Sequence, residues 1–93
     1  MGVLLICTDL AASDPRHAKL DAALQEDHGT CRVLGSTWAV FTSEPASKWY
    51  ARVRRVLGPD YPVLVMGTMS DHAGHLPEGT MAWLDRHLGP GRE

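Results

Sequence analysis

The order of apolar and amphipathic segments over residues 2–69 is the feature that most constrains how this chain folds. The segments alternate as strand, helix, strand, strand, helix, strand. The first segment, GVLLICTDL, has no polar residue before Thr8 and Asp9, which is typical of a central strand covered by protein on at least one face. With right-handed crossovers, this order predicts a four-stranded antiparallel sheet in the order 4-1-3-2, with both helices on one face.

Local signals mark where the first helix and the hairpin begin and end. The segment DPRHAKLDAALQEDHG predicts a helix with Asp14 as N-cap, Pro15 at the first helical position and Gly29 as terminator. The segments TCRVL and TWAVFT predict two strands joined by Gly35 and Ser36, a pair suited to a two-residue type II′ turn. Together with the segment order, these signals predict an α+β, ferredoxin-like βαββαβ fold.

Both helices of this fold have apolar stripes at intervals of three and four residues. Ser43 is expected to cap the second helix, and Gly58 followed by Pro59 is expected to end it. The stripe of the first helix is narrow and partly alanine, comprising Leu20, Ala23, Leu24 and Asp27. The stripe of the second helix comprises Trp49, Val53, Val56 and Leu57.

The third strand is apolar on both faces, with Trp38 and Val40 on one face and Ala39 and Phe41 on the other. Because two helices cover only one face of the sheet, the sequence predicts that a partner subunit covers the other face. A chain of 93 residues buries only about 60–65% of the surface that it exposes when unfolded. We therefore expect a homodimer.

Residues 1–93 are expected to form one domain, with a core at 1–69, a polar loop at 70–79 and a short additional helix at 80–89. The apolar fraction of 44% is ordinary for a folded protein. No apolar run approaches the roughly 20 residues of a membrane helix. Residues 1–10 lack the basic region and cleavage site of a signal peptide, so we expect a cytoplasmic protein without a membrane partner.

Charge and cysteine content limit the function further. A net charge of −2 argues against a chain built uniformly to coat nucleic acid, although it is compatible with one basic face. Cys7 and Cys31 fall inside predicted strands, and we expect both to be reduced core thiols.

Asp9 is the first candidate for chemistry, because it ends the predicted central strand. Mg²⁺ prefers oxygen ligands and can be held by one or two carboxylates together with water. A two-fold homodimer would bring a second Asp9 to its axis. The alternative is that Asp9 simply ends a strand and accepts hydrogen bonds from nearby backbone N–H groups, and the spacing alone favours this simpler interpretation.

A basic stripe on the second helix is the next candidate. Lys48, Arg52 and Arg55 recur at helical spacing, with Arg54 beside them, and could contact phosphates. The same pattern also fits a solvated helix face, and the acids of the first helix would weaken its field. These acids are Asp21, Glu26 and Asp27.

Histidines give weaker signals. His72 and His75 lie three residues apart in a polar loop, but zinc sites normally need three or four protein ligands and no recognised spacing completes this pair. A solvated loop therefore fits better than a metal site. The remaining histidines are expected at the surface or at helix ends, and these are His17, His28 and His87.

Several short motifs occur in the same order as in a known family. They are the apolar strand ending in residues 8–10 (TDL), basic Arg16 and Lys19 on the following helix, and the segment HGTCRVLGSTWAVFTSEPASKWYARVRRVL. In these features the chain resembles the small CRISPR-associated adaptation nucleases and their SinR-like and virulence-associated protein D relatives. Residues 36–38 (STW) and 83–84 (WL) look most like the SinR-like branch.

The resemblance implies a homodimer of ferredoxin-like protomers. In the nucleases of the family a strand-end Asp, which Asp9 matches, is linked to Mg²⁺-dependent cleavage of nucleic acid, and Arg16 and Lys19 would then position the backbone. Other members are DNA-binding partners of an integrase. Two functions therefore stay open: a metal-dependent endonuclease for DNA or RNA, and a non-catalytic dimeric module that binds nucleic acid or a protein.

Overall fold

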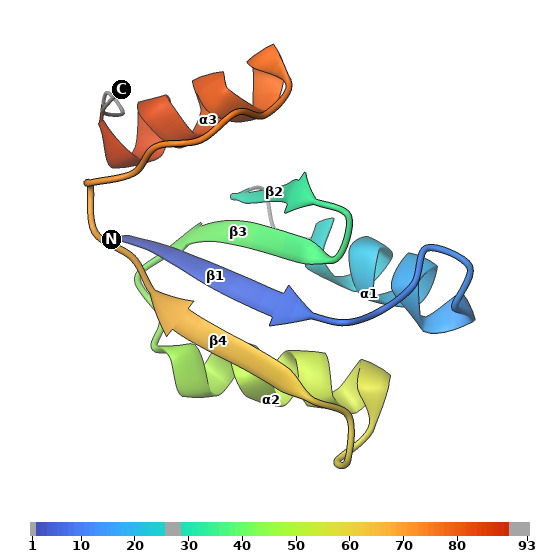
Figure 1. The fold of residues 1–93 in the computed structure, drawn as a ribbon. Coiled ribbons are helices and arrows are strands. Elements are labelled where there is room, and N and C mark those ends of the chain that lie inside the picture. The colour runs from blue at the N-terminus through green and yellow to red at the C-terminus, as the bar shows by residue number, and fades with distance from the viewer. Residues whose placement is uncertain (1, 26–28, 90–93) are drawn as a thin grey trace.

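The computed structural model describes residues 2–25 and 29–89, which form one four-stranded sheet and three helices (Figure 1). The strands are β1 (Gly2–Thr8), β2 (Thr30–Leu34), β3 (Thr37–Thr42) and β4 (Val63–Gly67), and the helices are α1 (Pro15–Gln25), α2 (Ala46–Leu57) and α3 (Glu78–Leu88). All strand pairs are antiparallel, and the sheet order is β2-β3-β1-β4. This is the predicted order 4-1-3-2 read from the opposite edge, so the order and the α+β class are confirmed.

β1 is the central strand, as predicted, and it separates two apolar layers. It pairs with β3 and with β4, so that Leu5 lies opposite both Ala39 and Met66. Ile6 is fully buried in the layer beneath α1 and α2, whereas Val3 is buried in the layer on the other face. Side chains alternate between the faces of a strand, so a run of apolar residues supplies both layers.

α1 begins at Pro15 as predicted, and the carboxylate oxygen Oδ1 of Asp14 caps it by accepting the backbone N–H of Arg16 at 2.9 Å. Its buried stripe differs from the prediction, because Ala23 is exposed and His17 is buried. Residues 26–28, which precede the predicted terminator Gly29, lie outside the described residues; they are Glu26, Asp27 and His28.

The two ends of α2 follow different rules. The predicted cap at Ser43 is wrong: Pro45 precedes the first helical residue, no side chain caps the helix, and Thr42 accepts the N–H of Glu44 instead. The C-terminal prediction is confirmed, because Gly58 has a φ of 91° and donates its N–H to the carbonyl of Arg54 at 2.8 Å. The predicted apolar stripe is buried at Trp49, Val53 and Leu57.

The hairpin turn lies at Gly35 and Ser36 as predicted, but it is not type II′. That turn requires a positive φ at its first residue, and among the described residues the positive φ angles belong to Gly58 and Gly89. The register shifts between Arg32 and Leu34, which leaves an extra residue in β2. A bulge of this kind adds local twist, and a primed turn is then not needed to match the strands.

α3 covers part of the second face of the sheet, where the sequence predicted a partner subunit. It begins at Glu78, two residues before the predicted start, and ends at Leu88, one residue before the predicted end, where Gly89 follows with a φ of 93°. Trp83 and Leu84 pack with Phe41 and Ala39 in the second apolar layer. Trp38 and Val40 lie in the other layer and are already buried by α1 and α2. These strand residues therefore do not need a second subunit to cover them.

The remaining part of the second face is open. Leu64 and Met66 on the edge strand β4 are 57% and 46% exposed. Cys7 and Cys31 also lie on this face and are not disulfide-bonded; β3 runs between their strands, and burial raises the pKa of the Cys31 thiol. No helix in the described part of the chain is long and apolar enough to cross a membrane.

Candidate functional site

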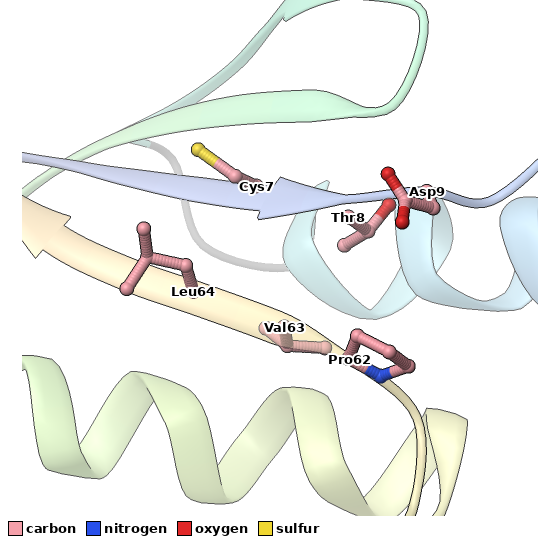
Figure 2. A pocket seen from close by; sticks show the side chains of 6 residues that line it. All are labelled: Cys7, Thr8, Asp9, Pro62, Val63 and Leu64. Carbon is pink, nitrogen blue, oxygen red and sulfur yellow. The ribbon is translucent and has the colours of Figure 1, made fainter.

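Asp9 lies exposed directly after β1, at the edge of a shallow hollow of about 350 Å³. Figure 2 shows the side chains of this hollow, which come from the end of β1 and from the start of β4. The neighbours of Asp9 there are Cys7, Thr8, Pro62, Val63 and Leu64. The hollow is therefore mostly apolar, with a single carboxylate at its edge.

Reciprocal hydrogen bonds fix the end of β1 to the β2–β3 turn. The carbonyl of Ser36 accepts the N–H of Thr8 at 3.1 Å and its hydroxyl at 3.0 Å, while the Ser36 hydroxyl donates to the carbonyl of Thr8 at 2.8 Å. The Thr8 hydroxyl also accepts the N–H of Leu10 at 3.3 Å. The backbone on both sides of Asp9 is thus held in one geometry.

His17 supports the same turn from beneath; it lies at a helix end, one of the two predicted alternatives, but it is buried rather than at the surface. Its ring is only 5% exposed, and Nε2 lies 2.6 Å from the carbonyl of Gly35, so Nε2 carries a proton and donates. The ring also packs against Trp38, whose indole N–H donates to the carboxylate of Asp21 at 2.8 Å. A buried histidine is accommodated here because its ring nitrogen finds an acceptor in the turn carbonyl of Gly35.

Asp9 is the one carboxylate among the described residues that line this hollow. The Thr8 hydroxyl is engaged with Ser36 and Leu10, and the other lining residues offer no carboxylate. Across the described residues no group of three or more His, Cys, Asp or Glu side chains is placed to hold a metal ion. A single carboxylate satisfies little of the octahedral shell of Mg²⁺.

His72 links the polar loop to α3. Its Nδ1 lies 2.8 Å from the carbonyl of Ser70, and its Nε2 lies 3.1 Å from the carboxylate of Asp85. The hydrogen bond to Ser70 and the nearby Asp85 carboxylate raise the pKa of His72. Both ring nitrogens face acceptors, so His72 acts as a connector, while His75 lies exposed in the loop.

Arg16 is neutralised locally. Its guanidinium donates to both carboxylate oxygens of Asp14, at 3.1 and 2.8 Å, and lies 4.7 Å from the centre of the Tyr61 ring. These bonds lower the pKa of Asp14 to about 2 and raise the pKa of Arg16. The same carboxylate caps α1, so Arg16 belongs to the cap, and its charge is largely cancelled for a distant phosphate. Lys19 is exposed farther along α1.

Arg52 is occupied in a similar way. Its Nη2 donates to both carboxylate oxygens of Glu44, at 2.8 and 3.0 Å, and its guanidinium stacks 4.4 Å from the centre of the Trp49 ring. Lys48 lies one turn before it, with Nζ 4.0 Å from Glu44. Arg52 therefore covers a core tryptophan, whereas Lys48 points largely into solvent.

Two exposed arginines and a tyrosine line a second hollow, on the outer side of α2. This hollow has a volume of about 420 Å³ and is formed by Tyr50, Ala51, Arg54, Arg55 and Pro59. Within the described part of the chain, neither Arg54 nor Arg55 forms a salt bridge. Tyr50 was not predicted as part of a site, although its four-residue spacing from Arg54 places both on one helix flank.

Comparisons with protein-family models, with curated proteins and with solved structures find no match to this chain. The resemblance to the CRISPR-associated adaptation nucleases therefore stays a prediction based on short motifs. The structural features that bear on function are the two hollows, beside Asp9 and beside Tyr50, and the basic side chains of α2.

Proposed function

We propose that this chain is a nucleic-acid-binding module, and that the outer surface of α2 contacts the phosphate backbone. The observation that carries the proposal is the charge of this helix. Its sequence, ASKWYARVRRVL, contains four basic residues and no acidic residue. Phosphate contacts from clustered Lys and Arg supply most of the sequence-independent affinity of such proteins.

The arrangement of the charges supports phosphate contact along the length of the helix. At 100° per residue, Lys48 and Arg52 lie toward one flank, Tyr50 and Arg54 toward the other, and Arg55 between them. Arg52 is engaged by Glu44, so Lys48, Arg54 and Arg55 are the side chains that would reach phosphates, with Lys19 on the neighbouring helix α1.

The test measures binding of fluorescein-labelled DNA and RNA by fluorescence anisotropy over a range of salt concentrations. The double variant Arg54→Gln/Arg55→Gln should lower affinity and reduce the slope of log K against log salt by about 1.4–1.8, because each lost phosphate contact contributes about 0.7–0.9. Unfolding of each variant is followed in parallel to confirm that it remains folded.

A matched control removes the same charge elsewhere. Arg32 on β2 and Arg86 on α3 are exposed, so Arg32→Gln/Arg86→Gln changes the net charge equally without touching α2. The salt slope of this control should stay close to that of the unaltered chain. Equal losses of affinity in both double variants would show that net charge, and not the surface of α2, accounts for binding. Absence of binding to any nucleic acid would reject the proposal.

The proposed module is a homodimer of ferredoxin-like protomers that associate through the edge strand β4. β4 is an edge strand, and its residues VLVMG include no charge and no proline. Two of these residues, Leu64 and Met66, have exposed side chains. Such an edge pairs readily with its own copy in antiparallel fashion. Met66→Glu should give a monomer in sedimentation at micromolar concentration, whereas Leu34→Glu, on the opposite edge strand, should not. A monomeric unaltered chain would refute the dimer.

Metal-dependent cleavage at Asp9 is a second candidate, favoured by the exposure of this carboxylate beside a hollow. Antiparallel pairing of two β4 edges would hold the two Asp9 residues apart, because each lies beside the start of its own β4 strand, so paired carboxylates need an association centred on this hollow instead. Asp9→Asn should abolish any cleavage of DNA or RNA that depends on Mg²⁺ or Mn²⁺, while the dimer persists. Cleavage that survives this change would exclude the site, and no cleavage by the unaltered chain would leave a binding module only.

A further inference from the structure

We infer that the hollow beside Tyr50 is a subsite for an unpaired base, so that this module prefers single-stranded to double-stranded nucleic acid. The inference rests on the proposed function, because it assigns a substrate class to the same surface of α2. Phosphate contacts alone do not distinguish the two forms. The distinction has to come from a group that touches a base.

Tyr50 is such a group. It is 38% exposed and lies in a concave site, with Ala51 and Pro59 as apolar walls and two guanidinium groups at the rim. The volume of about 420 Å³ falls within the range of about 300–1,000 Å³ of small-molecule sites. Residues four apart on a helix are surface neighbours, so Tyr50 adjoins Arg54 and Ala51 adjoins Arg55.

Core packing accounts for the other large aromatic side chain of α2 but not for Tyr50. Trp49 is 2% exposed, and its indole N–H donates to the hydroxyl of Thr42 at 3.2 Å. Tyr50 is left outside the apolar core and beside positive charge. An aromatic ring next to arginines is the combination that stacks a base and holds its flanking phosphates.

A paired base cannot use this subsite. Within a duplex both faces of a base are covered by neighbouring bases, so stacking on Tyr50 requires a strand whose bases can be turned outward. Arg54 and Arg55 would then donate to the phosphates on either side, a geometry that the planar guanidinium group suits.

The neighbouring hollow sets a boundary to the subsite. It measures about 280 Å³, shares Pro59 as a common wall and contains Asp60 and Arg16. Arg16 is neutralised by Asp14, and Asp60 repels phosphate. The strand is therefore expected to follow the charge of α2 away from Asp60 rather than across Pro59.

The experiment compares a labelled oligothymidine with an oligoadenine–oligothymidine duplex of the same length, and repeats the comparison with RNA. The unaltered chain should bind the single strand more tightly. Tyr50→Ala should weaken binding of the single strand about five- to tenfold, the lower part of the range for loss of one stacked base, and leave duplex binding unchanged. Tyr50→Phe should retain affinity, because the ring remains. Leu34→Ala removes an exposed apolar side chain from the edge strand β2, outside both hollows, and should have no effect.

The outcomes separate this inference from the proposed function. Equal affinity for both forms, with Tyr50→Ala unchanged, would overturn the subsite while the charge of α2 still explained binding. Equal weakening of single-strand and duplex binding by Tyr50→Ala would also overturn it, because Tyr50 would then support the helix rather than a base. If thymidine monophosphate bound tightly and longer strands bound no better, the ligand of the subsite would be a free nucleotide rather than a strand. No binding of any form would overturn both.

Discussion

The hydrogen bonds of Thr8 lead to a sharp prediction about what fixes the end of β1. Thr8→Val keeps the shape of a β-branched side chain and removes only the hydroxyl. The carbonyl of Ser36 would lose one of its two donors, and the N–H of Leu10 would lose its acceptor. Because Leu10 is buried, its N–H could not turn to water.

The magnitude follows from these two losses. One hydroxyl hydrogen bond is worth about 1 kcal/mol, and an orphaned buried N–H costs about 1–3 kcal/mol. The Leu10 bond is long, at 3.3 Å, so the lower end applies. We expect Thr8→Val to reduce the free energy of unfolding by about 2 kcal/mol.

Thr30→Val is the matched control, because the same substitution should act in the opposite direction there. The hydroxyl oxygen of Thr30 is buried and has no hydrogen-bond partner among the described residues. Replacing it with a methyl group removes a buried polar atom, so the free energy of unfolding should be unchanged or rise by about 1 kcal/mol.

Urea unfolding followed by tryptophan fluorescence measures both variants. With a slope of about 1–1.5 kcal/mol per molar for a small domain, Thr8→Val should lower the midpoint by roughly 1.5 M without changing the slope. Equal midpoints for the two variants would show that the Thr8 hydroxyl does not hold the strand end.

Two further predictions test other parts of the fold. Gly29→Ala would place a Cβ atom 2.7 Å from the backbone carbonyl oxygen of Phe41 and should lower the free energy of unfolding, measured by thermal unfolding, by about 1–3 kcal/mol. In the control Gly74→Ala the new Cβ meets nothing within 4 Å, and the loss should stay under about 0.5 kcal/mol. Equal losses would contradict the close approach at Gly29. The raised pKa of His72 means that its protonated form is favoured by folding. Its stabilising contribution should be full below its ordinary pKa and disappear as pH rises through the raised value, so amide exchange in α3 should accelerate over that range once intrinsic rates are corrected. Asp85→Asn should lessen this pH dependence, and an NMR titration of His72 with an ordinary midpoint would refute it.

The sequence predicted the parts of the fold that depend on short-range signals and on a regular period. The apolar run of β1 with its buried Ile6, the cap at Asp14 and the terminator at Gly58 all follow from local rules. The type of the β2–β3 turn could not be predicted from local rules, because the bulge after Arg32 depends on how the two strands twist together. The burial of His17 at its helix end was not predicted either, since only the folded chain brings the Gly35 carbonyl to its ring.

The candidate site was less predictable, because whether an arginine is free to bind a phosphate depends on whether a carboxylate of the folded chain pairs with it. Arg16 and Arg52 carry the same charge as Arg55 in the sequence. In the structure, Asp14 and Glu44 neutralise the first two. Glu44 lies eight residues before Arg52 and outside the helix, so no helical spacing rule signals the pair. Tyr50 was not predicted because an aromatic residue on a helix is usually expected in the core, whereas the structure leaves this side chain exposed.

The topology itself explains why Asp9 lacks a second carboxylate. In an antiparallel sheet the end of one strand adjoins the start of its neighbours, and the end of β1 therefore lies beside the starts of β3 and β4, with Cys7 opposite Thr37 and Thr8 opposite Val63. Neither start carries an acid. Among the described residues no other carboxylate lines the hollow of Asp9, so chemistry that needs two carboxylates there would draw the second one from another chain and should vanish on dilution below the dimer dissociation constant. Binding through α2 needs no such partner, because its basic residues and Tyr50 belong to one helix. Cleavage and binding should consequently separate with protein concentration, and an activity that persists in a monomeric Met66→Glu variant would place the chemistry elsewhere than at paired Asp9 residues.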